Sequence, residues 1–398
     1  MIIKPKVRGF ICTNSHPAGC AANVGEQIAF IKGEDLSATS ESTEGSPKNV
    51  LIVGASTGYG LASRITAAYG YGAKTLGLFF EKPPTERKTA SAGFYNSAAF
   101  EEQAHADGLY AKSINGDAFS NEAKQQAIEL IRADMGQVDL VVYSLASPRR
   151  TDPISGETYV STLKPIGNAY TSKNLNTDTR VVGEISVEPA SDEDIANTIK
   201  VMGGEDWSLW MNALSEAGVL APACKTVAYT YIGEKLTKPV YGDATIGKAK
   251  EHLDVTAEQL NEQLDVQASV SVLKAVVTQS SSAIPVMPLY LAILFKEMKS
   301  AGTHEGCIEQ LGRLFQECIY SKSPRLDDAQ RFRVDELELL PEMQARVEAI
   351  WPKVVTENLM EVTDFAGYQK DFLRLFGFGV DGVDYDEEFD PIVASNFL

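Results

Sequence analysis

Short apolar runs alternate with amphipathic segments along the first 146 residues of this chain. Runs rich in Val, Ile and Leu predict buried strands, and segments with apolar residues every three or four positions predict helices. The expected strands are 48–55, 74–81, 109–114 and 137–146, and the expected helices are 58–70, 94–107 and 120–136. This alternation predicts an α/β fold with a doubly wound parallel sheet of the Rossmann type.

The pattern changes after residue 147. Residues 148–190 are polar and rich in turn residues, with Tyr and Val at alternating positions, which predicts a hairpin-like excursion. Beyond it, helices are expected at 191–203, 205–218 and 243–265, and strands at 225–233 and 268–279. The remainder is mostly helical, and we expect one domain over residues 1–398.

Charge and composition narrow the class of protein. The net charge is −18, and such a field repels nucleic acid and anionic membranes. No apolar run approaches the roughly 18–20 residues that span a bilayer, and the N-terminus lacks the sustained apolar core of a secretory signal. Five scattered cysteines favour reduced thiols. We therefore expect a cytoplasmic protein without nucleic-acid or membrane partners.

Cys12, His16 and Cys20 recur every four residues, which imitates the spacing of metal ligands. The sequence shows no fourth ligand, and a structural zinc site needs four. Pro17 and Gly19 also interrupt the helical face that the spacing would require. No metal site is predicted.

A glycine-rich loop joins the first expected strand to the first helix. In VGASTGYGLAS, Gly54, Gly58 and Gly60 follow a buried strand and open a helix. Glycines let phosphates approach the backbone, and the helix N-terminus offers free N–H groups to a pyrophosphate. The spacing G-x-x-x-G-x-G is the variant used by short-chain dehydrogenases. The loop predicts a dinucleotide site, with a glycine-rich turn that binds nothing as the alternative.

The ends of the following strands carry further candidate residues. Glu81 ends the second strand, near where dinucleotide folds place an acid on the adenosine ribose. A carboxylate there binds two ribose hydroxyls and repels a 2′-phosphate, which favours NADH over NADPH; the alternative is a solvated strand end. By sheet order, the next two loops supply residues to the adenine and to the nicotinamide ribose: Asp117 and Ala118, then Leu145 and Ala146.

Residues 229–253 contain tyrosines and lysines suited to proton donation. Short-chain dehydrogenases place Tyr and Lys four residues apart on one helical face. Here only Tyr231 and Lys235 have that spacing, and a glycine that ends a strand lies between them. A shared helical face is therefore not expected for this pair.

Tyr241 offers two other partners, Lys248 and Lys250. A helix running straight through Tyr241 would favour Lys248, seven residues on. However, Gly242 and Asp243 interrupt such a helix, and Asp243 is a good N-cap. Spacing alone does not choose between the two lysines.

Long motifs extend over nearly the whole chain. They include GASTGYGLASRI, YSLASPRRTDP, KVMGGEDW, YGDATIGKAKEHL, VLKAVVTQSSSAIPVMPLYLAILFKEMK and LFGFGVDGVDYD. Together they resemble the single-chain trans-2-enoyl-CoA/enoyl-ACP reductases of the FabV type, enlarged relatives of the short-chain dehydrogenases. That family carries Tyr-x8-Lys, a spacing that Tyr241 and Lys250 fit. The resemblance therefore gives Lys248 no catalytic role.

The resemblance implies NADH-dependent reduction of the 2,3 double bond of trans-2-enoyl thioesters, in fatty acid synthesis or short-chain acyl metabolism. Tyr241 would donate to the thioester oxygen, and an ammonium at Lys250 would lower the pKa of Tyr241 and hold the nicotinamide ribose. Tyr231 would contact substrate. The implied cofactor residues are Gly54, Ala55, Ser56, Thr57, Gly58, Tyr59, Phe80, Glu81, Asp117, Ala118, Leu145, Ala146, Lys250, Val276, Val277 and Thr278.

The enlarged parts of the chain are assigned to the substrate. We expect residues 148–222 to cover the substrate site as an inserted hairpin and helices, and residues 284–398 to form a C-terminal helical extension. Within it, Met287 and Phe295 are candidate lining residues of the acyl pocket, although so apolar a helix is more often core. The expected partners are an acyl-CoA such as crotonyl-CoA or an acyl carrier protein, and the expected state is a monomer.

Two other functions and one further site stay open. A short-chain-type carbonyl reductase would use the same Tyr and Lys, and a dinucleotide sensor would bind without turnover. Arg149 and Arg150 either bind a CoA phosphate or belong to a solvated loop.

Overall fold

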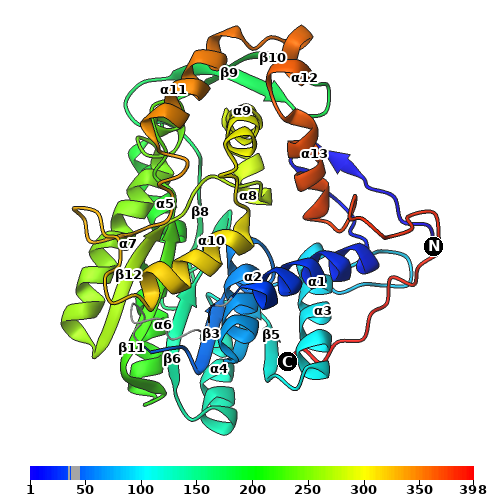
Figure 1. Cartoon of the computed structure of the whole chain (residues 1–398). Helices are drawn as coiled ribbons and strands as arrows, with labels where there is room; N and C mark the ends of the chain where they lie inside the picture. The colour runs from blue at the N-terminus through cyan, green and yellow to red at the C-terminus, as the bar shows by residue number, and fades with distance from the viewer. Residues whose placement is uncertain (35, 37–44) are drawn as a thin grey trace.

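Seven parallel strands form the central sheet of the computed structural model, which describes residues 1–34, 36 and 45–398. Their order is β13-β12-β11-β6-β3-β4-β5 (Figure 1). The strands are β3 (Asn49–Val53), β4 (Lys74–Phe79), β5 (Ala111–Asn115), β6 (Val138–Tyr143), β11 (Leu220–Thr230), β12 (Val266–Val272) and β13 (Phe332–Arg333). The predicted doubly wound, Rossmann-type sheet is confirmed.

Helices cover both faces of this sheet. Alternate residues of a strand point to opposite faces, and in β3 Val50 and Ile52 join one apolar cluster while Leu51 and Val53 join the other. The first cluster holds α1 (Pro17–Gly33), α2 (Gly58–Ile65), part of α3 (Ala92–Ala106) and α10 (Cys307–Leu314). The second holds α4 (Asn121–Asp134), α6 (Glu205–Glu216) and α7 (Thr245–Gln263).

A third apolar cluster lies beyond one end of the sheet, around α9 (Figure 1). Helix α9 is buried nearly all round, as its apolar sequence predicts. The elements that contribute here or lie beside it are α8 (Gln279–Ser282), α9 (Met287–Ala301), α11 (Pro341–Ile350), α12 (Leu359–Val362) and α13 (Phe365–Arg374).

The excursion after β6 consists of two hairpins and α5 (Asp192–Met202). The hairpins are β7 (Arg149–Thr151) with β8 (Thr158–Val160), and β9 (Tyr170–Asn176) with β10 (Val181–Val187). The segment before β9 pairs with the start of α7, since Thr245 N donates to Lys164 O at 3.0 Å and Ile166 N donates to Asp243 O at 3.1 Å. The excursion thus holds the turn that leads into α7.

Short elements complete the chain. They are β1 (Val7–Arg8), β2 (Ile11–Cys12), the π-helical turns Thr66–Gly70 and Phe315–Ile319, and the 3₁₀ turns Lys238–Val240, Trp351–Lys353 and Thr356–Asn358.

Several expected boundaries are wrong. The second strand ends at Phe79 and β12 ends at Val272, so 80–81 and 276–278 lie in the loops that follow. Helix α7 begins at Thr245 with Ala244 as its N-cap. Asp243 is not the cap, because Lys164 O already accepts from an N–H of the first turn. Strand β13 was not expected, since two residues carry no periodicity.

Candidate functional site

The glycine loop packs so closely that only glycine fits at two positions. Gly54 has φ +93°, and a Cβ there would lie 2.0 Å from Ser144 O. A Cβ on Gly60 would lie 1.8 Å from Gly54 O. Thr57, the N-cap of α2, makes no side-chain hydrogen bond to the helix, so that side chain leaves the first N–H groups to a ligand. The loop therefore has the shape and the donors that a pyrophosphate requires.

Residues that follow three different strands meet at this loop. A Cβ on Gly54 would lie 3.2 Å from Leu145 Cδ2, and a Cβ on Gly58 would lie 3.7 Å from Thr278 Cγ2. Tyr59 Oη donates to Lys274 O at 2.6 Å. Val276 and Val277 are buried just before Thr278. The sheet thus gathers most of the predicted cofactor residues at one place.

Glu81 is held beside the glycine loop. Ser56 Oγ donates to Glu81 Oε1 at 2.7 Å, and Glu81 N donates to Asn115 Oδ1 at 2.8 Å. Burial raises the pKa of Glu81, although Ser91 and Ser56 donate to its carboxylate. Glu81 is therefore a partly buried, anchored carboxylate rather than a solvated strand end. Its neighbour Phe80 is 80% exposed.

The loops after β5 and β6 hold further predicted cofactor residues. Asp117 Oδ1 accepts from Phe119 N at 3.0 Å and so shapes its own turn. Ala118 is buried, with its carbonyl accepting from Trp210 Nε1 at 3.0 Å. Ala146 is exposed. Asp117 and Ala118 follow β5 and Ala146 follows β6, and their cofactor roles stay predictions.

Tyr241 lies in the turn before α7 and is 9% exposed. Its ring packs edge-on against the ring of Tyr231, with centroids 5.0 Å apart. Burial raises the pKa of Tyr241, and a hydrogen bond with the backbone of Tyr231 opposes this effect. The expectation that Lys250 lowers this pKa is wrong, because the pKa is raised and Lys250 is not among the groups that shift it.

Lys250 and Lys248 lie on different faces of α7. Lys250 Nζ donates to Tyr229 O at 3.2 Å, at the end of β11. Burial lowers the pKa of Lys250 to about 8, while Asp254 raises it. Lys248 is exposed and pairs with Glu251, with Nζ to Oε2 at 2.7 Å. Only Lys250 therefore points to the sheet.

The predicted substrate residues are all largely buried. Tyr231 Oη lies 3.0 Å from Thr237 Oγ1 and donates to Glu338 Oε1 at 3.0 Å. Met287 and Phe295 are each 2% exposed and belong to the core cluster around α9. Two surface hollows, beside Arg333 and beside Asp265, are lined by none of the predicted site residues.

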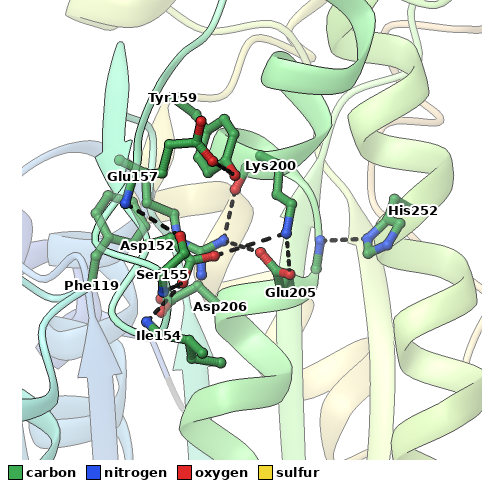
Figure 2. Close-up of polar contacts among 12 residues, drawn as sticks. Phe119, Asp152, Ile154, Ser155, Glu157, Tyr159, Lys200, Glu205, Asp206 and His252 are labelled. Carbon is green, nitrogen blue, oxygen red and sulfur yellow. Dashed lines mark hydrogen bonds and ion pairs between the residues drawn. The ribbon is translucent and has the colours of Figure 1, made fainter.

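Neither interpretation of Arg150 is correct. It is 1% exposed, and its Nη1 donates to Glu205 Oε2 and to Lys200 O, each at 2.7 Å. Lys200 lies between Glu205 and Asp152, with Nζ 2.7 Å from Glu205 Oε1 and 3.8 Å from Asp152 Oδ2 (Figure 2). Arg150 is thus a buried member of a partly exposed ionic cluster that joins β7 to the start of α6. Arg149 is exposed.

His16 has a structural role. It is the N-cap of α1, and its Nδ1 accepts from Gly19 N at 3.2 Å. Among residues 1–34, 36 and 45–398, no three His, Cys, Asp or Glu side chains are grouped as metal ligands. In the same part of the chain, no helix is both long and apolar enough to cross a bilayer.

Sequence reasoning missed the buried carboxylate of Glu338, which touches Tyr231 and Tyr290. It lies in the acidic stretch VDELELLPE, where a surface position is the ordinary expectation. No local signal distinguishes it from its neighbours.

Three family models match the chain. One described as the trans-2-enoyl-CoA reductase catalytic region matches residues 88–320, and one described as its NAD(P)H binding domain matches 2–86. A third, described as an enoyl reductase FAD binding domain, matches 326–389. That segment forms β13 and helices α11 to α13. The glycine loop that suits a dinucleotide lies elsewhere, between β3 and α2. We therefore assign no flavin to the segment.

Relatives match over their full length. The enoyl-[acyl-carrier-protein] reductase [NADH] of Teredinibacter turnerae is 68% identical over 397 residues, 99% of each chain. That of Saccharophagus degradans is 66% identical, again over 99% of each chain.

Solved structures also match nearly the whole chain. The trans-2-enoyl-CoA reductase of Treponema denticola in complex with NAD is 50% identical, with TM-score 0.95, over 98% of this chain and 99% of that one. The enzyme of Clostridium acetobutulicum in complex with NADH is 42% identical, with TM-score 0.92, over 98% of both chains. One family model covers more than half of the chain, and its relatives are similar from end to end. The chain therefore belongs to the trans-2-enoyl-CoA reductase family.

Proposed function

We propose that this protein reduces the 2,3 double bond of trans-2-enoyl thioesters with NADH and releases the saturated acyl thioester. The observation that carries the proposal is the position of Tyr241, buried in the turn before α7, while Lys250 on α7 points to the sheet whose glycine loop suits a dinucleotide. NADH, when bound, would supply the hydride for the β-carbon, and a proton from Tyr241 or from water would complete the α-carbon.

The residues of the chain act on the charge that develops on the substrate. As the β-carbon gains hydride, negative charge grows on the thioester oxygen, and a donor aimed at that oxygen lowers the barrier. Tyr241 is that donor. Its buried surroundings keep it protonated at neutral pH, so it acts as a neutral hydroxyl that donates a hydrogen bond.

The contacts described above support the following cofactor roles. Gly54 to Tyr59 receive the pyrophosphate, and the Lys250 ammonium binds the nicotinamide ribose. Glu81, anchored by Ser56 and Asn115, accepts from the adenosine ribose hydroxyls and repels a 2′-phosphate. Met287 and Phe295 on α9 belong to the wall that bounds the acyl chain.

We also propose CoA as the preferred carrier, a monomeric state and a cytoplasmic location. Size-exclusion chromatography with light scattering at the assay concentration measures the state directly.

One assay tests the reaction. NADH oxidation with crotonyl-CoA should be catalytic, with butyryl-CoA as product. A carbonyl reductase would oxidise NADH only with an aldehyde or ketone, and a sensor would bind NADH without turnover. Binding of NADH together with no turnover of crotonyl-CoA or crotonyl-carrier protein would reject the proposal.

A further inference from the structure

Glu338 is a fully buried carboxylate that three donors satisfy. It lies between β13 and α11 and is 0% exposed. Tyr231 Oη and Tyr290 Oη donate to its Oε1 at 3.0 Å and 2.7 Å, and Ala275 N donates to its Oε2 at 2.6 Å. Burial of a carboxylate is costly unless it is hydrogen-bonded, so these three contacts keep Glu338 in one position.

The donors come from separate parts of the fold. Tyr231 directly follows β11, Ala275 lies in the loop after β12, and Tyr290 is on α9. Gln344 on α11 donates to Tyr290 Oη at 3.0 Å and to Glu338 O at 2.7 Å. The carboxylate therefore connects the loop of the cofactor site with the helices of the C-terminal segment.

Tyr231 is the link to Tyr241. Its ring packs edge-on against the ring of Tyr241, 5.0 Å between centroids. Because Tyr231 gives its single proton to Glu338, its hydroxyl is not free to donate to a substrate oxygen. Tyr241 is then the tyrosine left to donate to the thioester.

We propose that Glu338 is a positioning residue for enoyl reduction: it holds Tyr231 by its hydroxyl, and Tyr231 in turn fixes the ring of Tyr241 against the thioester oxygen. The inference rests on the proposed function, since it assumes that Tyr241 is the donor. Such a role explains why the charged side chain of Glu338 is buried in the C-terminal segment, which contributes no residue to the predicted cofactor site.

The test is a double-mutant cycle between Glu338→Gln and Tyr231→Phe, with crotonyl-CoA and NADH. The glutamine retains the size of the side chain but presents an amide to groups that donate to a carboxylate. We expect Glu338→Gln to lower kcat at least tenfold while the Kd of NADH changes less than twofold. We expect Tyr231→Phe to remove most of the effect of Glu338→Gln, because residues that act through one contact are non-additive.

Asp335→Asn is the matched control. Asp335 is a buried carboxylate of the same segment, 1% exposed, but it pairs with Arg333, with Oδ1 2.7 Å from Nε. Its variant should keep kcat within twofold of wild type. An equal loss of kcat in both variants, or full additivity of Glu338→Gln with Tyr231→Phe, would overturn the proposal in favour of a purely structural role.

Tyr290→Phe covers the case in which Glu338→Gln fails to fold. It removes one donor from Glu338 and keeps the carboxylate. We expect a smaller loss of kcat that disappears in the Tyr231→Phe background, and a loss that persists there contradicts the inference. If wild type itself does not turn over enoyl thioesters, the proposed function fails; if wild type is active and Glu338→Gln is fully active, only this inference fails.

Discussion

Tyr241 is buried in the turn before α7 and Lys250 contacts the end of β11, whereas Lys248 faces solvent. Loss of a positioned acid typically lowers the rate by about 10²–10⁴-fold, so Tyr241→Phe should fall in this range and still bind NADH. Lys250→Met should lose turnover and bind NADH more weakly. Lys248→Met is the control, since the two lysines are about 200° apart around the helix. Steady-state kinetics in which Lys248→Met was impaired and Lys250→Met active would reverse the assignment.

The lowered pKa of Lys250, about 8, predicts a pH dependence. Below this pH the side chain is an ammonium that can bind the ribose, and above it a neutral amine. The pH profile of kcat/KM for NADH reports groups of the free enzyme. We expect it to fall as the pH rises through about 8, and we expect Lys250→Met to lack this fall. A wild-type profile that stayed level to pH 10 would contradict the assignment.

Glu81 predicts the choice of cofactor. Glu81→Ala removes the acceptor for the ribose hydroxyls and the repulsion of a 2′-phosphate, so the preference for NADH over NADPH should weaken. The ratio of kcat/KM for the two cofactors measures this change. Ser56→Ala, which removes only the anchor of the carboxylate, should have a smaller effect. Equal use of both cofactors by wild type would show that Glu81 does not select NADH.

At the scale of elements, the turn before α7 decides where Tyr241 points. Gly247, in the first turn of α7, packs against this turn: a Cβ there would lie 1.9 Å from Gly242 O and 2.8 Å from Tyr241 O. The excursion after β6 holds the other side, through Lys164 and Thr245. The position of Tyr241 therefore depends on close backbone contact between three segments.

Gly247→Ala should displace Tyr241 without removing any functional group. Misplacement of a reacting group by about 1 Å costs on the order of 10²-fold in rate, so kcat should fall by about this factor while the glycine loop still binds NADH. Gly183→Ala in β10 is the control, because nothing lies within 4 Å of a Cβ there. Isothermal titration with NADH and steady-state kinetics separate the two effects, and an unchanged kcat in Gly247→Ala would show that the turn adjusts freely.

At the scale of the whole molecule, the net charge of −18 bears on the carrier. Acyl carrier proteins are acidic, so the field of this protein repels them at long range, whereas CoA is small and needs only a few cations. We expect a higher kcat/KM for crotonyl-CoA than for the crotonyl-carrier protein at about 20 mM salt. The difference should narrow at about 300 mM, where the Debye length is shorter. Equal or better turnover of the carrier protein at low salt would reject the preference.

The sequence by itself determined the order of strands and helices and the glycine loop, because periodicity and glycine spacing are local properties that the fold does not override. It was less accurate at the ends of elements. Residues 80–81 and 276–278 lie beyond their strands, since hydrogen bonding to neighbouring strands, rather than hydrophobicity, decides where a strand stops.

Only the tertiary structure decided how side chains from distant segments meet. Spacing left Lys248 and Lys250 as alternatives, a resemblance selected Lys250, and the direction of α7 relative to β11 placed Lys250 against the sheet. The buried positions of Arg150 and Glu338 had no local signal, because a charged residue becomes buried only when partners from other elements form an ion pair or hydrogen bonds with it. Those partners, Glu205 for Arg150 and two tyrosines for Glu338, are brought together by packing over long sequence separations.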